Sequence, residues 1–446
     1  MAALALGLTL ALASGAQGLK FTHPMKLRNS PPKGNLQGGE PSVAFDRNGR
    51  WVYVVAPGGG QNGGVGFWRS HTRGRHFSRG KSLGSFNGGF DADVDVGRDH
   101  TVYVADLEIT ANALCRSHNH GKHFDSGCDT GIASNQTGVE SDREWVNPSP
   151  RKRRLVYFSY HDISTETPLV YVSHQKGDPG TFAPCGPVLA PGSEAEQNYV
   201  PGGTNQGKLL VSRDNSLYVP ILEPTNPATL DSDYNNFYMA IARHGCDGST
   251  IFDDVKVYSN PKANLANIFP YVTEDGRGNI YAAFIGISGR DGHHSGVYLL
   301  VSHSRGKQWR GPIRVDPRKS KAAALGSLTA GPHAGDVALG FYSTRSTHDP
   351  NAHKNRWKFD VAVSRTGGHR FRRDVVTRHP IHYGQICNKG ILCTGGRNLL
   401  DFSSIEVNPR TGCVLTVFAG DPYDKPKNNR HAEAAPYVSR QKHHCF

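Results

Sequence analysis

The chain has 446 residues, of which 52 are Gly and 27 are Pro, and it carries a formal net charge of +13. Many short aromatic and β-branched runs lie between these turn-forming residues, which indicates an all-β fold. The length leaves room for a large core and does not require two domains. Phosphate-binding loops, Cys-x-x-Cys zinc patterns and Ser/His/Asp elbows are missing from the sequence, which argues against those classes of site.

Residues 1–18 form an apolar run that ends in the small residues Ser14, Gly15 and Ala16. This pattern is typical of a secretory signal peptide, so we expect residues 19–446 to be secreted as a single domain. An uncleaved anchor and a buried helix are the alternatives, because no basic residue precedes the run. No later stretch is long and apolar enough to span a bilayer.

The mature chain divides into repeated units of short extended runs separated by turns. We expect strands at residues 41–46, 51–55 and 65–68; 92–96, 101–104 and 113–115; 144–146, 155–158 and 169–172; 208–211, 216–219 and 237–241; 270–273, 279–282 and 297–301; 337–342 and 359–363; 404–407, 414–418 and 436–438. Repeated units of this kind indicate a β-propeller of four-stranded blades.

Four units end in a shared signature that begins with Ser and has Gly at its fifth position and an aromatic residue at its eighth. The copies begin at Ser70, Ser117, Ser302 and Ser364. Because Gly adopts a positive φ without steric cost, the signature predicts a hairpin turn between the third and fourth strands of a blade. We expect the aromatic residue to pack back onto the sheet.

We count seven units, with six as the alternative because the first strand of the sixth unit, near His333, is weak. The seventh unit has no segment left for a fourth strand after Ser439, where the signature begins again. The N-terminal run at residues 20–26 would supply that strand. It would close the ring and remove the free sheet edges.

The eight Cys residues agree with export and disulfide formation. Proximity in the sequence favours two pairs, Cys115–Cys128 across one signature turn and Cys387–Cys393 around a small loop. The remaining residues would pair as Cys185–Cys246 and Cys413–Cys445.

The positive charge is scattered, except for the run from Arg151 to Arg154 between two expected strands. This position favours a solvated hairpin tip, and contact with an acidic polymer is the alternative. No aromatic residues are interleaved with the basic ones, so we do not expect nucleic acid as a partner. We expect a monomer that binds a glycan or another cell-surface ligand.

The signature resembles the Asp-box, or BNR, repeat of the sialidase superfamily, Ser-x-Asp-x-Gly-x-x-Trp/Phe. The Asp of that repeat is replaced in the four copies by Thr72, Asn119, Ser304 and Thr366. These residues are small and polar and can still hydrogen-bond across the turn. The resemblance implies a sialidase-like propeller with its boxes on the face opposite the active site. Residues 138–145 and 395–402 are also similar to segments of bacterial sialidase-like secreted proteins.

In four-stranded blades, the signature turns lie on one face of the disc. The loops between second and third strands, and between successive blades, lie on the other, and we expect a site on this loop-rich face. Its polar candidates before first strands are Glu40, Asp91, Asp93, Asp142, Arg143, Glu144, Arg397 and Asp401. Those after second strands are Asp106, His161, Asp162, Arg345, His348, Asp349 and Asp421.

The sialidase resemblance implies an arginine cluster that holds a substrate carboxylate, for which Arg143, Arg345 and Arg397 are the candidates. The N-terminal Arg-Ile-Pro segment of the family is missing here, and residues 26–28 are a poor substitute.

The resemblance also implies a Tyr nucleophile activated by a carboxylate. Tyr160 beside Glu144 is the candidate pair, with Asp142 or Asp162 as the acid. Asp401 completes the candidate catalytic set.

Each candidate also has a structural interpretation. An Asp or Glu before a strand commonly bonds its own backbone, and Arg143 and Arg397 would then bridge neighbouring blades. A ring of carboxylates also suits a hard cation such as calcium. Residues 91–95 have the Asp spacing of a calcium loop but alternate like a strand, so we expect no cofactor. The pairs His293–His294 and His443–His444 point in opposite directions on an extended chain and are weak metal ligands.

The sequence therefore predicts a secreted propeller whose loop-rich face binds a glycan or another extracellular ligand. The alternatives are an exo-α-sialidase or related glycoside hydrolase, and an extracellular protein-binding scaffold.

Overall fold

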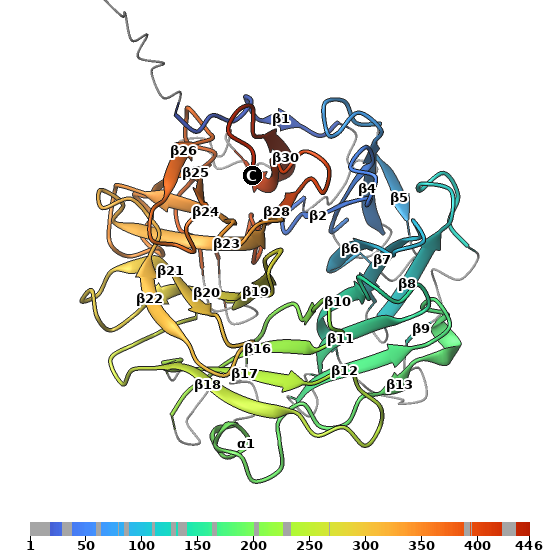
Figure 1. Ribbon diagram of the computed structural model, residues 1–446. Coiled ribbons are helices and arrows are strands. Elements are labelled where there is room, and N and C mark those ends of the chain that lie inside the picture. Colours follow the sequence, from blue (N-terminus) through green and yellow to red (C-terminus); the bar gives the residue numbers. More distant parts are fainter. Residues whose placement is uncertain are drawn as a thin grey trace, which may run out of the picture.

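The computed structural model describes residues 18–446 except for 29–37, 59–63, 79, 84–88, 109–111, 126–130, 133–140, 163–166, 200–204, 226–232, 267, 388–392, 394 and 422–433. Seven antiparallel sheets stand as blades around a common centre (Figure 1). The prediction of an all-β propeller with seven blades is confirmed, and the six-bladed alternative is wrong. We name the blades A to G in chain order, starting from β2.

In each blade the first strand is innermost and the last is outermost. Blade A contains β2 (Ser42–Phe45), β3 (Val52–Ala56), β4 (Val65–Ser70) and β5 (Lys81–Leu83). Blade B contains β6 (Ala92–Val96), β7 (Val102–Leu107), β8 (Asn112–Ser117) and β9 (Gly131–Ile132). Blade C contains β10 (Ser141–Pro148), β11 (Val156–Asp162), β12 (Thr167–Ser173) and β13 (Ala183–Pro184).

Blade D contains β14 (Asn205–Gln206), β15 (Leu210–Val211), β16 (Leu217–Glu223), β17 (Asn236–Ala242) and β18 (Asp253–Ser259). Blade E contains β19 (Tyr271–Glu274), β20 (Ile280–Ile287), β21 (Ser295–Ser302) and β22 (Arg310–Arg314). Blade F contains β23 (Ala322–Ala330), β24 (Val337–Thr344), β25 (Arg356–Ser364), β26 (Arg372–Val375) and β27 (His382–Tyr383). Blade G contains β28 (Ser404–Val407), β29 (Val414–Gly420), β30 (Ala435–Arg440) and β1 (Met25–Lys26). The short helices η1 (Pro179–Thr181) and α1 (Glu194–Asn198) lie between blades C and D in the chain.

The core consists of apolar layers between neighbouring blades. Successive residues of a strand point to opposite faces, so each blade feeds two layers. On β3, Val54 packs into the layer shared with blade G, while Val55 packs into the layer shared with blade B. Middle strands are therefore buried on both faces and read as continuous apolar runs, which is why the sequence located them well.

The ring is closed by the N-terminal strand. Met25 of β1 pairs with Val438 of β30, and the Thr22 amide donates to the Arg440 carbonyl at 2.8 Å. The prediction that residues 20–26 complete the seventh blade is confirmed.

The weak strand of the sixth unit was placed wrongly near His333. The first strand of blade F is β23, which begins at Ala322 and ends before His333, a residue of the following turn. Ala and Gly residues dominate its first half and have low β-propensity, so this nine-residue strand lacked a recognisable pattern.

The signature turns have the predicted geometry. Gly74 has a φ of 74°, and its amide donates to Ser70 Oγ at 3.1 Å. The His76 amide donates to Thr72 Oγ1 at 3.0 Å, so the residue in the Asp position still bonds across the turn. The same two bonds recur in the copies that begin at Ser117, Ser302 and Ser364. Phe124 packs edge-on against Phe67 of the neighbouring blade, as expected for an anchoring aromatic.

Three disulfides link Cys185 to Cys246, Cys387 to Cys393, and Cys413 to Cys445. The fourth predicted pair includes Cys128, which lies outside the described residues, as does the predicted signal sequence up to residue 17. Among the described helices, none has the length and apolar character needed to cross a membrane.

Candidate functional site

The loop-rich end of the central channel is organised around one guanidinium. Arg143 begins β10 and is only 3% exposed. Its Nη2 atom bonds Glu40, lies 3.1 Å from Asp91 Oδ1 and lies 3.8 Å from Asp401 Oδ2. These carboxylates precede the inner strands of blades A, B and G. The sequence prediction that residues before first strands gather on one face therefore describes this cluster.

Two aromatic rings enclose the same guanidinium. The Arg143 Cζ atom lies 5.1 Å from the ring centre of Phe269 and 4.9 Å from that of Phe402. A cation between two ring faces is attracted to their electron-rich surfaces, most strongly where water is excluded. Sequence reasoning missed both rings, although each lies in the connection that precedes an inner strand.

The backbone at this end has an unusual conformation. Glu40, Arg143 and Leu400 have φ values of 44°, 59° and 56°, and Ile268 and Leu325 repeat the feature at 78° and 43°. A positive φ is uncommon in residues other than Gly and persists where the surrounding structure enforces it. In β10, a register shift between Asp142 and Trp145 accompanies this conformation. Such bulges redirect side chains, here that of Arg143.

The carboxyl groups around Arg143 have perturbed pKa values. Burial, followed by the charge of Asp91, raises the pKa of Asp142 to about 7. Burial also raises the pKa of Glu40 well above its usual range, against the opposing effect of Arg143. Asp142 shares a hydrogen bond with Asp91, and Glu40 shares one with Asp401. The raised pKa values of Asp142 and Glu40 make these two groups candidate proton donors near neutral pH.

Glu144 lies deeper in the same cluster. Burial and then Asp91 raise the pKa of Glu144 well above its usual range. Among the described residues, neither carboxyl oxygen of Glu144 has a hydrogen-bond partner. A buried carboxyl group in this situation is stable in its neutral form.

Arg397 forms the accessible edge of the cluster. Its Nη1 and Nη2 atoms bond the two carboxylate oxygens of Asp401 at 2.8 and 2.9 Å, and its side chain is 28% exposed. Burial opposes the charged form, but the charge and hydrogen bonds of Asp401 outweigh it and raise the pKa of Arg397. Two of the three predicted arginines, Arg143 and Arg397, therefore share one carboxylate.

Two other predicted catalytic residues, Arg345 and Tyr160, interact with residues outside this cluster. Arg345 directly follows β24 and is exposed, and its charge lowers the pKa of Asp360 in β25 against the larger effect of burial. The Tyr160 ring stacks on Tyr171 with 5.8 Å between ring centres. The pKa of Tyr160 is raised by burial and then by Tyr171 and Asp162, with no contribution from Glu144.

Asp162 ends β11 and is 3% exposed. It pairs with Thr167 of β12 on one side and with Ser141 of β10, next to Asp142, on the other.

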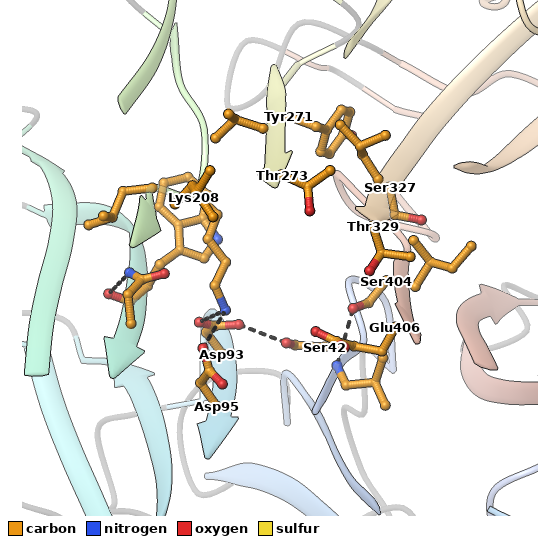
Figure 2. A pocket seen from close by; sticks show the side chains of 18 of the residues that line it. Ser42, Asp93, Asp95, Lys208, Tyr271, Thr273, Ser327, Thr329, Ser404 and Glu406 are labelled. Carbon is orange, nitrogen blue, oxygen red and sulfur yellow. Dashed lines mark hydrogen bonds and ion pairs between the residues drawn. The ribbon is translucent and has the colours of Figure 1, made fainter. Parts of the chain in front are cut away.

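Below the cluster, the channel holds a cavity of about 480 Å³ that inner strands line with both apolar and polar side chains. Figure 2 shows the Lys208 side chain pointing toward Asp93 and Asp95. Lys208 Nζ lies 2.7 Å from Asp93 Oδ2 and 3.9 Å from Asp95 Oδ2. Burial raises the pKa of Asp95 to about 6 against the opposing effect of Lys208. Burial and then the charge of Asp95 raise the pKa of Glu406 to about 8. The sequence analysis named Asp93 but missed Lys208 and Glu406. Alternation of polar and apolar residues along the inner strands could have indicated that these side chains face the channel.

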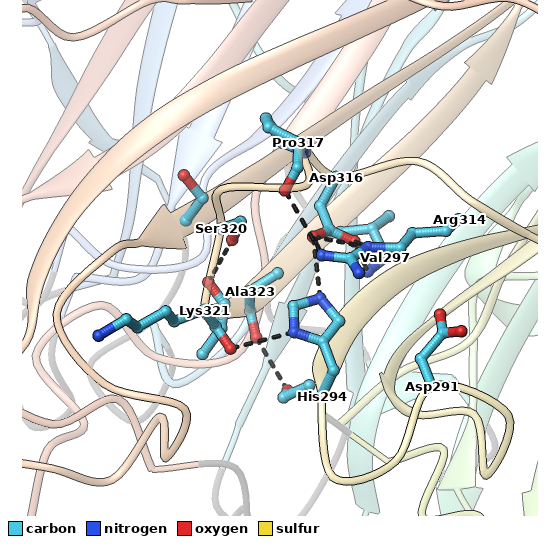
Figure 3. Close-up of polar contacts among 12 residues, drawn as sticks. Asp291, His294, Val297, Arg314, Asp316, Pro317, Ser320, Lys321 and Ala323 are labelled. Atoms are coloured by element: carbon cyan, nitrogen blue, oxygen red, sulfur yellow. Dashed lines mark hydrogen bonds and ion pairs between the residues drawn. The ribbon is translucent and has the colours of Figure 1, made fainter.

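His294, a weak metal candidate from the sequence, has a structural role (Figure 3). Its Nε2 atom lies 2.9 Å from Asp316 Oδ2, and its Nδ1 atom lies 3.1 Å from the Lys321 carbonyl oxygen. Arg314 also bonds Asp316, at 3.0 Å. Both ring nitrogens of His294 are therefore engaged within the protein. In the described part of the chain, no group of three or more His, Cys, Asp or Glu side chains is arranged to hold a metal ion.

No protein-family model and no curated protein matches the sequence. Among solved structures, the fold is similar to a polysaccharide lyase of family PL25, an ulvan lyase bound to -[GlcA(1-4)Rha3S]-. That comparison has a TM-score of 0.55 and 9% identity, and covers 94% of this chain and 96% of that chain. A protein of unknown function from Dyadobacter fermentans DSM 18053 has a TM-score of 0.50 and 10% identity over 95% and 100% of the two chains.

The chain therefore shares its overall fold with the ulvan lyase. A Hadza microbial sialidase, Hz136, is also similar, with a TM-score of 0.46 and 13% identity over 93% of this chain and 68% of that chain. At these identities the similarity concerns the fold, and the chemistry of the propeller has to be argued from its own residues.

Proposed function

We propose that the propeller binds a glycan at the loop-rich end of its channel, and that it does so outside the cell. The observation that carries this proposal is the cluster of carboxyl groups around Arg143, with Asp142 and Arg397 at its accessible edge. Blades A, B, C and G each contribute a residue to it. A purely structural bridge between two blades needs one carboxylate, whereas this cluster concentrates five carboxyl groups and two guanidiniums at the channel axis: Glu40, Asp91, Asp142, Glu144, Asp401, Arg143 and Arg397.

The chemistry of the accessible groups suits sugar hydroxyls. Carboxyl and carboxylate oxygens accept hydrogen bonds from hydroxyl groups, and a protonated carboxyl group also donates one. Asp142, with a pKa of about 7, supplies both functions near neutral pH. The Arg397 fork is held by Asp401 and leaves its outer edge for a ligand oxygen. The ulvan lyase with the similar fold acts on a polysaccharide, which agrees with a glycan as the ligand.

Binding is tested by screening the purified chain against immobilised glycans and comparing Asp142→Asn and Arg397→Ala with the wild type. We expect each variant to weaken binding by about tenfold, the effect of one lost charge-assisted hydrogen bond. Arg372→Ala, on the exposed outer strand β26, is the matched control and should bind normally. A wild-type chain that binds no glycan, or an equal loss in Arg372→Ala, would overturn the proposal.

Glycan cleavage is the second candidate, and the carboxyl pair of Asp142 and Asp91 favours it. A carboxyl group with a pKa of about 7 acts as a general acid at neutral pH. The same variant separates the two functions, because Asp142→Asn should abolish release of reducing ends from any bound glycan and only weaken binding. An exo-α-sialidase has less support, because Arg345 influences Asp360 and the Tyr160 ring stacks on Tyr171 rather than on a residue of the cluster.

A further inference from the structure

The opposite face of the disc carries a ring of arginines. This turn face contains the signature turns and the turns between the first and second strands of each blade. Within the described residues, six of the seven first-to-second turns contain an arginine, and His333 is in the seventh. The six are Arg47, Arg98, Arg151, Arg213, Arg277 and Arg410. The repetition places an arginine on this face in six of the seven blades.

Four members of this ring face a single surface cavity. Its lining consists of Arg47, Arg98, Arg151 and Arg213, together with Pro150. Arg47 and Pro150 also line the lower end of the central channel, so the cavity continues into the channel. The concentration of positive charge is thus at the mouth of the channel rather than distributed over the rim.

Backbone carbonyl groups accept hydrogen bonds from three of the four guanidiniums and hold them in place. Arg47 donates to the Pro150 carbonyl oxygen, and Arg98 donates to the Arg151 carbonyl oxygen. Arg213 Nη1 donates to the Gly276 carbonyl oxygen at 2.6 Å. Neutral carbonyl groups orient the arginines without cancelling their charge, which leaves the remaining N–H groups for a ligand.

The neighbouring carboxylates are engaged with other residues. Asp46 Oδ1 bonds His100 at 2.6 Å, and Asp214 Oδ2 pairs with Arg305 at 3.0 Å. Asp95 faces Lys208 within the channel. Glu274 Oε2 accepts a hydrogen bond from the Arg213 amide at 3.0 Å, and its negative charge partly offsets the charge of Arg213.

Arg47 and Arg98 of the cavity repel each other, and Asp95 and Asp46 offset part of the charge of Arg47. Burial, followed by the charge of Arg98, lowers the pKa of Arg47. A bound anion would relieve this repulsion, because like charges in proximity disfavour the charged form of each.

We propose that Arg47, Arg98, Arg151 and Arg213 form an oxyanion-binding site for the sulfate or carboxylate groups of an acidic polysaccharide. Arginine forks match planar and tetrahedral oxyanions and bind them with two parallel hydrogen bonds. Among the described residues, none that lines this cavity is aromatic, whereas sites for single-stranded nucleic acid stack bases on aromatic rings. A polymer of sugar residues requires no such platform.

The test compares two variants that lose the same number of positive charges, one at the cavity and one away from it. The ring variant is R47Q/R98Q/R151Q/R213Q. The control is R356Q/R370Q/R372Q/R378Q, which removes the same charge from exposed positions of blade F. Binding of both variants and the wild type to dextran sulfate, polygalacturonate and neutral dextran is measured over a range of salt concentrations, after circular dichroism has verified that both variants are folded.

We expect the wild type to bind a charged polymer and not neutral dextran, with affinity that falls as salt rises. The ring variant should bind at least about tenfold more weakly and with a shallower salt dependence. The control should lose less than about threefold. The charged polymer that binds more tightly identifies sulfate or carboxylate as the preferred group.

Three results would overturn the proposal: equal losses in the two variants, no binding of either charged polymer, or tighter binding of single-stranded DNA of matched charge. The site is independent of the glycan proposed for the loop-rich face. The ring variant should keep that binding, and Arg397→Ala should keep the binding of acidic polymers.

Discussion

Arg143 Nη2 lies 3.1 Å from Asp91 Oδ1, although the two residues precede or begin the inner strands of different blades. The same guanidinium bonds Glu40 of blade A and reaches Asp401 of blade G. One side chain thus joins four blades at the loop-rich end of the channel.

Removal of that side chain should destabilise the fold. Arg143→Met leaves Glu40, Asp91 and Asp401 without their shared cation, and an uncompensated buried charge typically costs about 3–5 kcal/mol. Urea denaturation at pH 7 measures the loss. Arg345→Met removes an exposed arginine and should change the free energy of unfolding by less than about 0.5 kcal/mol. Equal stability of the two variants would show that Arg143 does not hold the blades together.

The carboxyl group of Asp142 should make stability depend on pH. Its pKa is raised from 3.8 to about 7, so the folded chain binds this proton more tightly than the unfolded chain. The contribution is complete below about pH 4 and is lost as the pH rises through about 7. Asp142→Asn stays neutral and should be more stable than the wild type at pH 8 by at least about 1 kcal/mol, with little difference at pH 4.

Denaturation curves at both pH values test this expectation. Asp253→Asn, at an exposed position of β18, is the control and should follow the wild type at every pH. A constant offset between Asp142→Asn and the wild type would indicate an effect other than titration.

The pKa values of Asp95 and Glu406 in the channel should depend on the charge of Lys208. Its positive charge lowers the pKa values of Asp95 and Glu406, against the larger effect of burial. Lys208→Met should therefore move both pKa values upward from about 6 and about 8. Carboxyl carbon NMR titration reports both groups. Lys208→Arg keeps the charge and should leave them near the wild-type values, and unchanged titrations in Lys208→Met would contradict the coupling.

The disulfide between Cys185 and Cys246 should stabilise the fold more than the disulfide between Cys387 and Cys393. The first closes a separation of 61 residues and the second a separation of 6. A longer closed loop restricts the unfolded chain more, and we expect the double Ser variant of the first pair to lose about 2–4 kcal/mol. Thermal and urea denaturation of the two double Ser variants compare the losses, and a larger loss for the short loop would refute this ranking.

Most of the fold could be predicted from local sequence patterns. Short apolar runs and the turn at Ser70 are encoded within a few residues, so the blades and their orientation could be predicted from the sequence. The strand β23 was misplaced because its Ala and Gly residues carry little β-propensity. The closing strand was predicted by elimination, since only the seventh unit lacked an outer partner.

The candidate site was predicted less completely. Strand order places residues such as Asp91 and Asp401 on one face, and the sequence analysis found them. It did not reveal that Arg143 would contact both, because that contact depends on a left-handed backbone and a bulge in β10. Arg345 was grouped with them because it follows a second strand. Its position depends on the conformation of the loop after that strand, which the strand pattern does not predict. The sequence does contain the signal for the arginine ring, because an arginine recurs in equivalent turns of six units. The sequence analysis considered only the run from Arg151 to Arg154.

The pairing of β1 with β30 has a consequence for the order of assembly. Blade G takes its outer strand from one end of the chain and its other three from the opposite end. During synthesis the first strand must wait, unpaired, until more than 400 later residues have followed, as the pairing of Met25 with Val438 requires. Blades A to F can form from contiguous segments, whereas the ring is sealed in one late, long-range step. Premature termination would leave two sheet edges exposed, and such edges promote association between chains.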